Sequence, residues 1–552
     1  MGCMRSTLLA TTFAGTLGVA ALLTAVQPAP AVSAASTPND DKAIVHMLNR
    51  LGFGPRPGDV EKVRAMGTQA YIEQQLRPDR LSDAAMEARL AEFSTLGMTS
   101  REIAEKFALP AAEARRQQQA ANPGETGETA MAAAAQREAA RVLAELSAQK
   151  MLRAVYSDRQ LQEVLTDFWF NHFNVDARKG QTRFMLTEYE RDVIRPHVLG
   201  KFRDLLEATA KSPAMLMYLD NWMSADPAGP HLARQAQPRR RGRGGVSPPA
   251  GAARSAAGQQ NRRRGLNENY GRELMELHTL GVDGGYTQKD VTEVARAFTG
   301  WTIQNPQTGG GFAFDPRFHD PGQKVVLGHV IKAGGGERDG EEVLDMLARH
   351  PSTARFIATK LARRFVSDTP PDALVDRVAA RFTKTNGDLR QVMQTLLTSP
   401  EFFSPDAYRA KVKTPFEFVV SAVRASGADV PNALLLVRAM QQLGMPLYQC
   451  QPPTGYKDTA DAWVNTGALV NRMNFALQLA GGDSRPRDGL KGGPAAPSAA
   501  RDGRAKDGRA NDIITSVLNN DISDTTRDTI AKATTPQQMV ALTLGSPEFQ
   551  RR

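Results

Sequence analysis

The segment Ser157-Asp-Arg-Gln-Leu-Gln-Glu-Val-Leu-Thr-Asp-Phe-Trp-Phe-Asn-His172 indicates most clearly which class of fold the chain adopts. Ser157, followed three residues later by Gln160, is typical of the start of a helix. Behind this start, apolar residues recur at helical spacing and share one face. The face consists of Leu161, Leu165, Phe168, Trp169 and His172. The segment therefore predicts a helix with one buried side, and it places a histidine on that side.

Most other patterned segments also indicate helices. Thr287 followed by Asp290 resembles a second helix start, with an apolar stripe behind it. Two segments have the composition of strands, 311–314 and 324–331, and we expect them to pair across the residues between them. The sequence therefore predicts an all-α protein, mainly a multi-helix body, with one small β-hairpin near 311–331.

The first 34 residues have the pattern of a secretory signal peptide. Arg5 precedes an apolar run over 8–26, and Val32 and Ala34 stand where cleavage requires small residues. No later segment is apolar over the eighteen or more residues that a membrane span needs, so we expect no transmembrane segment after cleavage. The pattern of residues 1–34 predicts export, to the periplasm or to the cell exterior.

The formal net charge of +10 has one local source. The segment 231–265 contains nine arginines and no Lys, Asp or Glu, and a tenth basic residue, Arg5, leaves with the signal peptide. The remainder of the chain is therefore formally neutral. A Gly-, Pro- and Ala-rich basic tract cannot bury a core, so we predict a disordered insert. Export argues against a specific nucleic-acid partner for this insert, whereas an anionic surface polymer suits its charge.

We predict one helical domain over 35–482, from which the basic insert loops out. Residues 100–150 are rich in Ala, Gln, Glu and Arg, and we expect two exposed helices there, around a loop. A polar low-complexity linker follows at 483–512, and a helical tail at 513–552 is expected to pack on the body. Only Cys450 remains after cleavage, so an apolar core rather than a disulfide has to stabilise the fold.

Three of the eight histidines stand in patterned segments that also carry ionisable groups. His172 ends the stripe described above, and His278 ends the segment Glu268-Asn-Tyr-Gly-Arg-Glu-Leu-Met-Glu-Leu-His278. His319 stands beside Asp320 in the turn of the predicted hairpin. Neutral imidazoles and carboxylates suit Zn, Fe or Mn, so we predict His172, His278 and His319 as ligands of a divalent metal ion.

The same side chains also suit general acid–base catalysis. Glu273, Glu276 and Asp320 would complete or orient the histidines, and Arg272 would bind an anion or a carboxylate. Neither His-Glu-x-x-His nor Gly-x-Ser-x-Gly occurs in the chain. A histidine that is simply hydrogen-bonded in the core is the alternative at each position. Glu273, Glu276, Arg272 and Asp320 therefore form a candidate catalytic set whose reaction stays open.

Several long motifs follow one another along the chain: His46-Met-Leu-Asn-Arg-Leu-Gly-Phe-Gly-Pro55, Trp169-Phe-Asn-His-Phe173, Asn267-Glu-Asn-Tyr-Gly-Arg-Glu-Leu-Met-Glu-Leu-His-Thr-Leu-Gly281, Phe298-Thr-Gly-Trp301 and His319-Asp-Pro-Gly-Gln-Lys324. By these motifs the chain resembles the bacterial "domain of unknown function 1800" family over essentially the whole mature length. The resemblance implies an exported helical protein, and it transfers no catalytic residue because none is established in that family. The chain departs from the family at Tyr456, where a Gly-Trp is expected.

Two functions agree with these observations. The first is an exported, metal-assisted, hydrolase-like enzyme that acts on envelope or extracellular material. The second is a non-catalytic secreted scaffold. Genes of the resembled family often stand beside genes of exported sulfatase-like proteins, so the resemblance implies a sulfatase-like partner for such a scaffold. Alternatively, the segment 231–265 would attach the scaffold to an anionic surface polymer.

Overall fold

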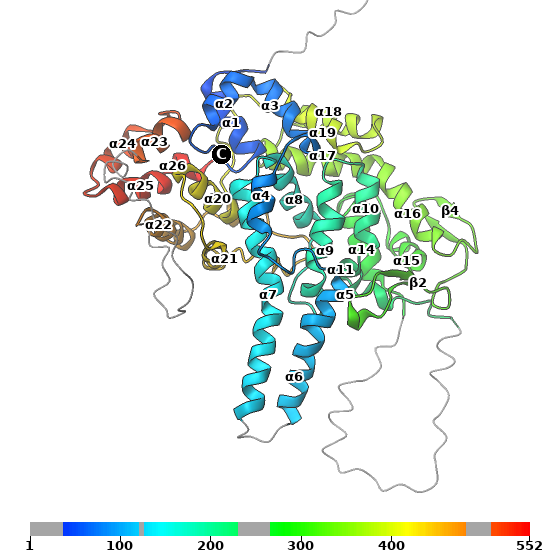
Figure 1. The fold of residues 1–552 in the computed structure, drawn as a ribbon. Helices are drawn as coiled ribbons and strands as arrows, with labels where there is room; N and C mark the ends of the chain where they lie inside the picture. The colour runs from blue at the N-terminus through cyan, green and yellow to red at the C-terminus, as the bar shows by residue number, and fades with distance from the viewer. Residues whose placement is uncertain (1–36, 121–125, 230–264, 482–508) are drawn as a thin grey trace, which may run out of the picture. The chain divides into compact units, whose positions relative to one another are not determined.

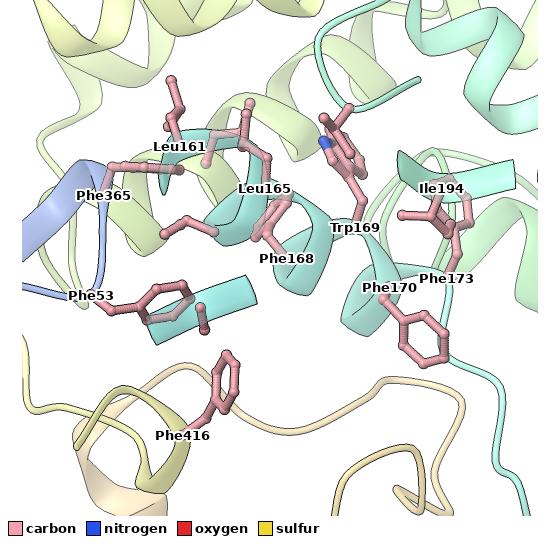
Figure 2. Close-up of a cluster of buried hydrophobic side chains, with 14 of the residues drawn as sticks. Phe53, Leu161, Leu165, Phe168, Trp169, Phe170, Phe173, Ile194, Phe365 and Phe416 are labelled. Atoms are coloured by element: carbon pink, nitrogen blue, oxygen red, sulfur yellow. The ribbon is translucent and has the colours of Figure 1, made fainter. Parts of the chain in front are cut away.

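The predicted apolar stripe lies in helix α8 (Gln160–His172) of the computed structural model (Figure 1). The side chains of Leu161, Leu165 and Trp169 are fully buried. Figure 2 shows Phe53 and Phe416 in the same apolar cluster, and their rings meet edge to face with centroids 5.1 Å apart. The helix therefore forms part of the main apolar core, which explains why its period is so clear in the sequence.

The structure describes residues 37–120, 126–229, 265–481 and 509–552. Within these ranges helices dominate, and the strands are two short antiparallel pairs. The predicted all-α class is therefore confirmed. No helix in this part of the chain has both the length and the hydropathy to cross a bilayer.

Several expectations fall on other residues. The signal peptide over 1–34 lies outside the described residues, as does the basic insert 231–265 apart from Gly265. Most of the predicted linker 483–512 also lies outside them, and its last residues belong to α23 (Arg509–Asp512). Thr37–Arg552 form one unit by their internal contacts.

The N-terminal half consists of short helices and the long α7, whose outer part extends away from them with α6 beside it (Figure 1). The helices before α8 are α1 (Asp41–Leu51), α2 (Asp59–Met66), α3 (Thr68–Gln75), α4 (Ala84–Leu90), α5 (Ser100–Ile103), α6 (Leu109–Ala120) and α7 (Thr126–Tyr156). Helices α6 and α7 lie side by side. Phe107 and Val142 belong to a second, smaller apolar cluster where this pair joins the body. Most of the predicted 100–150 stretch is thus helical in the described residues.

Helices also make up most of the remaining described chain. They are α9 (Leu186–Glu188), α10 (Phe202–Ala210), α11 (Pro213–Tyr218), α14 (Glu268–Glu276), α15 (Gln288–Ala297), α16 (Arg338–Arg349), α17 (Pro351–Phe365), α18 (Asp372–Lys384), α19 (Leu389–Leu397), α20 (Pro415–Ser426), α21 (Ala433–Gln442), α22 (Thr466–Gly481), α24 (Asp524–Ala531), α25 (Pro536–Gly545) and α26 (Pro547–Gln550). Helix α15 begins with the predicted capping box of Thr287 and Asp290.

The strands pair differently from the prediction. Strand β1 (Trp301–Ile303) pairs with β2 (Phe312–Phe314), and β3 (Lys324–Val326) pairs with β4 (His329–Ile331). The predicted pairing of 311–314 with 324–331 is therefore wrong. Leu327 and Gly328 both have positive φ, 50° and 79°, which is the geometry of a tight two-residue hairpin turn. The segment 324–331 consequently folds back on itself.

The C-terminal residues pack on helices of the body. Helix α25 contacts α22, and α26 follows α25 directly. The backbone of Arg552 then exchanges two hydrogen bonds with Lys411, at 3.2 and 2.8 Å. This ladder brings the Arg552 side chain beside Glu417 of α20, with 2.8 Å between the charged atoms.

Candidate functional site

Helix α8 ends at His172. The imidazole ring of His172 contacts Lys360 of α17. His172 Nε2 lies 3.1 Å from the backbone carbonyl oxygen of His278, and His172 Nδ1 lies 2.8 Å from Lys360 Nζ. Because a carbonyl oxygen only accepts, Nε2 carries the proton and donates it. Nδ1 is then the acceptor, and the Lys360 amine donates to it. The two contacts thus select one neutral tautomer of His172.

Burial controls the protonation of this pair. It lowers the pKa of His172 well below the ordinary value, and the nearby Lys360 and His278 lower it further. Burial also lowers the pKa of Lys360 to about 8, against an opposing effect of Asp458 and with a smaller lowering by Arg363. At neutral pH His172 is therefore neutral, and a fraction of Lys360 is a free amine that can accept a proton.

The His172–Lys360 pair borders a cavity of about 230 Å³, here called the Lys360 cavity. Helix α8 contributes Asp167, Phe168 and Asn171 to its wall in addition to His172. These positions follow at i, i+1, i+4 and i+5, so they lie on one side of the helix. The same side carries both core residues and cavity residues, which is why the apolar stripe of α8 ends in polar groups.

Helix α17 forms the opposing wall. Lys360, Arg363 and Arg364 follow at spacings of three and four, which places the three cations on one face. The helix begins with His350 as N-cap and Pro351 at its first position, where a missing N–H costs nothing. The start of α17 is thus set locally, and its cationic face follows from the helical period.

The segment 454–459 closes the Lys360 cavity and is held by Asn171. The Asn171 amide donates to the carbonyl of Tyr456 at 2.8 Å, and its oxygen accepts from the N–H of Tyr456 at 2.7 Å. Gly455, which directly precedes Tyr456, has a φ of +72°. A Cβ at this position would lie 2.3 Å from the backbone oxygen of Asn171. Only glycine permits so close an approach.

A group of buried charges lies behind α17, around Glu417; we call it the Glu417 cluster. Glu417 Oε1 lies 2.6 Å from Arg364 Nη1 and 2.8 Å from Arg552 Nη2. Arg364 also lies 3.4 Å from Asp458, which lines the Lys360 cavity. Although burial opposes it, the two guanidinium groups lower the pKa of Glu417 to about 2. The cavity therefore shares its wall with a network of buried ions.

His278 reaches the site, although mainly through its backbone. Its carbonyl oxygen accepts from His172, and the two imidazole centroids lie 6.2 Å apart. Burial lowers the pKa of His278 to about 3, and Lys360 adds to this effect. Both histidines are buried, and their rings lie side by side at the end of α8.

His319 belongs to a different contact set. Its Nδ1 donates to the carbonyl of Thr299 at 2.8 Å, and its Nε2 lies 3.1 Å from Asp339 Oδ2. The same carboxylate oxygen contacts the fully buried Lys324 at 2.6 Å. Both ring nitrogens therefore bind groups near the two small sheets.

The predicted single metal site formed by all three histidines does not fit these contacts. Both ring nitrogens of His172 and of His319 already have protein partners. Across the residues that the structure describes, no group of three or more His, Cys, Asp or Glu side chains is arranged to hold a metal ion. His172, His278 and His319 therefore do not form one set of ligands.

The four other predicted residues lie outside the lining of the Lys360 cavity. Arg272 donates to Gln288 at 2.6 Å, and Tyr286 donates to Glu276 at 3.1 Å. Glu273 is partly buried, and burial together with the charge of Glu276 raises its pKa. These residues form a polar surface on α14 rather than part of the cavity.

The Asp320 carboxylate joins its own loop to helix α15. Its carboxylate accepts from Arg296 at 2.6 and 3.2 Å and from the N–H of Gly322 at 2.8 Å. Burial opposes ionisation, but these donors lower the pKa of Asp320. Arg296 also binds Glu293 of the same helix α15. The position explains Asp320 as a link between this loop and α15.

Sequence reasoning missed the cations of α17. The signal was the spacing of Lys360, Arg363 and Arg364, which marks one helical face, but such a face is usually solvated. Its role as a cavity wall becomes visible only through the contact of Lys360 with His172, which is 188 residues away in sequence. The segment that contains Gly455 was noticed only because it departs from the resembled family at Tyr456.

The fold and the site together define a helical protein in which a Lys–His pair borders a basic cavity. The family model described as "Protein of unknown function (DUF1800)" matches residues 46–551. The chain therefore belongs to this family, as the sequence motifs indicated. No curated protein and no solved structure matches the chain.

Proposed function

We propose that the protein is an exported, hydrolase-like enzyme that carries out acid–base chemistry in the Lys360 cavity. The observation that carries the proposal is the 2.8 Å contact between Lys360 Nζ and His172 Nδ1 at the wall of a cavity. The pKa of Lys360, lowered to about 8, supports a role as base because an effective general base titrates near the working pH. Export rests on the signal-peptide pattern of residues 1–34.

The His172 side chain is a positioning group in this proposal. With its Nε2 proton on the carbonyl of His278, it holds Nδ1 toward Lys360 and so directs the amine. Lys360 as a free amine takes a proton from water or from a substrate hydroxyl, and the resulting ammonium returns it to the leaving group. This cycle balances protons within one residue and agrees with hydrolysis of a polymer or its substituents.

A substrate screen tests the proposal. Mature wild-type protein is incubated with chromogenic esters, phosphate esters, sulfate esters, glycosides and anilides, and hydrolysis is compared with Lys360→Met and Lys360→Arg. Lys384→Met, an exposed lysine at the end of α18, is the matched control. We expect turnover that both Lys360 variants lose by about 100-fold or more, the range of general-base effects. Turnover that survives in Lys360→Met would refute the role of Lys360.

Export is tested separately. Expression with and without residues 1–34, followed by fractionation of medium, envelope and cytoplasm, should place only the full-length product outside the cytoplasm. Retention of both products inside would refute export.

The second candidate is a non-catalytic secreted scaffold with a sulfatase-like partner or with an anionic surface polymer bound by 231–265. Its basis is the arginine content of that segment together with the family resemblance. Deleting 231–265 should release the protein from the envelope fraction at low salt if the segment provides the attachment, because such contacts are screened by salt. Unchanged fractionation after the deletion contradicts this candidate.

A further inference from the structure

We infer that the Lys360 cavity binds an oxyanion, a phosphate, sulfate or carboxylate group of the substrate, between Lys360 and Arg363. The inference deepens the proposed function, because it names the substrate class of the same cavity. It rests on the charges of the cavity wall and on which of them are already neutralised.

The wall of the Lys360 cavity carries an excess of positive charge. Four basic side chains line it against two acidic ones, and the lining histidine is neutral. The basic residues are Lys360, Arg363, Arg364 and Lys457, and the acidic ones are Asp167 and Asp458. A concave wall with two excess cations concentrates the positive potential inside it.

The two acidic residues are already held by other cations. Asp167 lies 2.7 Å from Lys150 and 3.9 Å from Arg364. Asp458 lies 3.4 Å from Arg364 and 3.7 Å from Lys411. Each carboxylate thus has two cationic neighbours, and neither forms an ion pair with Lys360 or Arg363, although Asp458 is near enough to raise the pKa of Lys360.

Lys360 and Arg363 lack carboxylate partners in the described part of the chain. The Lys360 amine contacts His172 and lies 5.5 Å from the centroid of the Phe356 ring. Arg363 Nε donates to the backbone carbonyl of Asp368 at 3.2 Å. No acidic side chain in the described ranges forms an ion pair with either residue. A guanidinium without a carboxylate, beside an ammonium, matches the two-point recognition of an oxyanion.

The Glu417 cluster adds to this field from behind. It contains six buried basic residues, and Glu417 is its one fully buried acid within the described residues; the basic residues are Arg50, Arg364, Lys411, Lys413, Arg472 and Arg552. The Nε and Nη1 atoms of Arg50 are buried without a hydrogen-bond partner. Burial lowers the pKa of several of these groups, that of Lys413 to about 7, whereas the neighbouring carboxylates raise the pKa of Arg364. The groups that stay protonated lie in a low-dielectric interior and are weakly screened, so they favour an anion in the adjacent cavity.

The size of the Lys360 cavity agrees with a small group. At about 230 Å³ it lies below the roughly 300–1,000 Å³ of sites that enclose a whole drug-sized ligand. It accommodates an oxyanion and the atoms next to it, while the rest of a larger substrate would extend from the open side. Arg363 then holds the oxyanion throughout, whereas Lys360 binds it as an ammonium and acts as a base only as the free amine, which is present in part at neutral pH because its pKa is lowered to about 8.

Calorimetric titration of the mature protein with sodium phosphate, sodium sulfate and sodium acetate tests the inference, at constant ionic strength set with chloride. We expect at least one of the three anions to bind and its affinity to fall tenfold or more in Arg363→Gln and in Lys360→Met. Arg381→Gln, an exposed arginine of α18, is the matched control and should bind like wild type. The anion that binds best identifies the substituent.

Two outcomes would overturn the inference: no binding of any of the three anions, or binding that is equal in wild type and in Arg363→Gln. If one of the two variants fails to fold by circular dichroism, the other variant decides, because each removes one of the two cations that the inference places on the anion. The proposed function fails independently: anion binding without Lys360-dependent turnover refutes the enzyme alone, and turnover of a neutral substrate without anion binding refutes the oxyanion alone.

Discussion

His172 donates from Nε2 to the backbone carbonyl of His278 at 3.1 Å, and this contact determines which ring nitrogen faces Lys360. A backbone carbonyl cannot titrate, so the tautomer is the same at every pH at which the fold is intact. The arrangement makes Lys360 the titrating member of the pair near neutral pH. The reactivity of the cavity therefore depends on the protonation state of Lys360 rather than on that of the imidazole.

Turnover in the Lys360 cavity should rise as the pH increases through about 8. The pKa of Lys360 is lowered to about 8, so the ammonium predominates below this pH and the free amine, the base, above it. A plot of kcat/KM against pH from 6 to 10 should show this rising limb. In Lys360→Arg the limb should disappear together with most of the activity, because arginine stays protonated. A wild-type profile that is flat from 7 to 9 contradicts the prediction.

Gly455→Ala should loosen the segment that closes the cavity. The substitution places a Cβ 2.3 Å from the backbone oxygen of Asn171 and keeps a residue at positive φ. Gly444→Ala is the matched control, because Gly444 also has positive φ, +79°, but open space around its Cβ position. We expect about 1 kcal/mol of lost unfolding free energy in the control and about 2 kcal/mol more in Gly455→Ala. Equal losses, measured by urea denaturation, would show that the close approach is unimportant.

Glu417→Gln should destabilise the protein strongly. The acid neutralises Arg364 and Arg552 in the interior, and its removal leaves buried cations unpaired, at a cost of about 3 to 5 kcal/mol. Glu401→Gln is the control, because its partner Arg377 is 44% exposed, and we expect a loss of about 1 kcal/mol or less. Unfolding free energies from denaturant titration at pH 7 provide the comparison.

The stability difference between wild type and Glu417→Gln should also depend on pH. The pKa of Glu417 is lowered from 4.5 to about 2, so the unfolded chain takes up this proton before the folded chain does. The stabilisation by its carboxylate is therefore complete above about 4.5 and is lost as the pH falls toward 2. The difference between wild type and Glu417→Gln should shrink over this window, and a constant difference would contradict the lowered pKa.

The sequence predicted mainly the features that depend on residues close together in the chain. The stripe of α8 and the capping box of Thr287 and Asp290 follow from helical spacing and local hydrogen bonds, and both occur in the structure. The predicted helix start at Ser157 is wrong: Arg159 is the N-cap of α8, and the Ser157 hydroxyl donates to Asp83 instead. The strand pairing failed because the turn at Leu327 and Gly328 competes with a longer loop, and a two-residue turn closes with less loss of entropy.

The candidate site was only half predictable. His172 and His278 each end a patterned segment, and the structure brings their rings to within 6.2 Å between centroids. Lys360 stayed hidden because its meaning comes from a contact with His172 across 188 residues, which helical periodicity cannot reveal. His319 was grouped with the other two histidines by residue type alone. Its ring instead contacts Thr299 and Asp339, each 20 residues away in sequence, and no local pattern indicates these contacts.

Lys413→Met should stabilise the protein at neutral and acidic pH. Lys413 is buried, its Nζ lies 3.8 Å from the centroid of the Phe549 ring, and no carboxylate of the described ranges is ion-paired with it. Burial lowers its pKa from 10.5 to about 7, against the opposing charge of Glu417. Between these values the unfolded chain binds more protons than the folded chain, so the stability contributed at this position rises with pH. The destabilisation by the buried charge is complete below about 7 and absent above about 10.5.

The Lys413→Met variant should therefore show its full advantage over wild type below pH 7, on the order of a few kcal/mol since one pKa unit corresponds to about 1.36 kcal/mol. The advantage should decrease steadily as the pH rises from 7 to 10. Denaturant titrations of wild type and Lys413→Met at pH 6, 8 and 10 measure it, with Lys384→Met as an exposed control that should match wild type throughout. A variant that is less stable than wild type at pH 6 would mean that the Lys413 ammonium is a favourable part of the Glu417 cluster, in contact with Phe549.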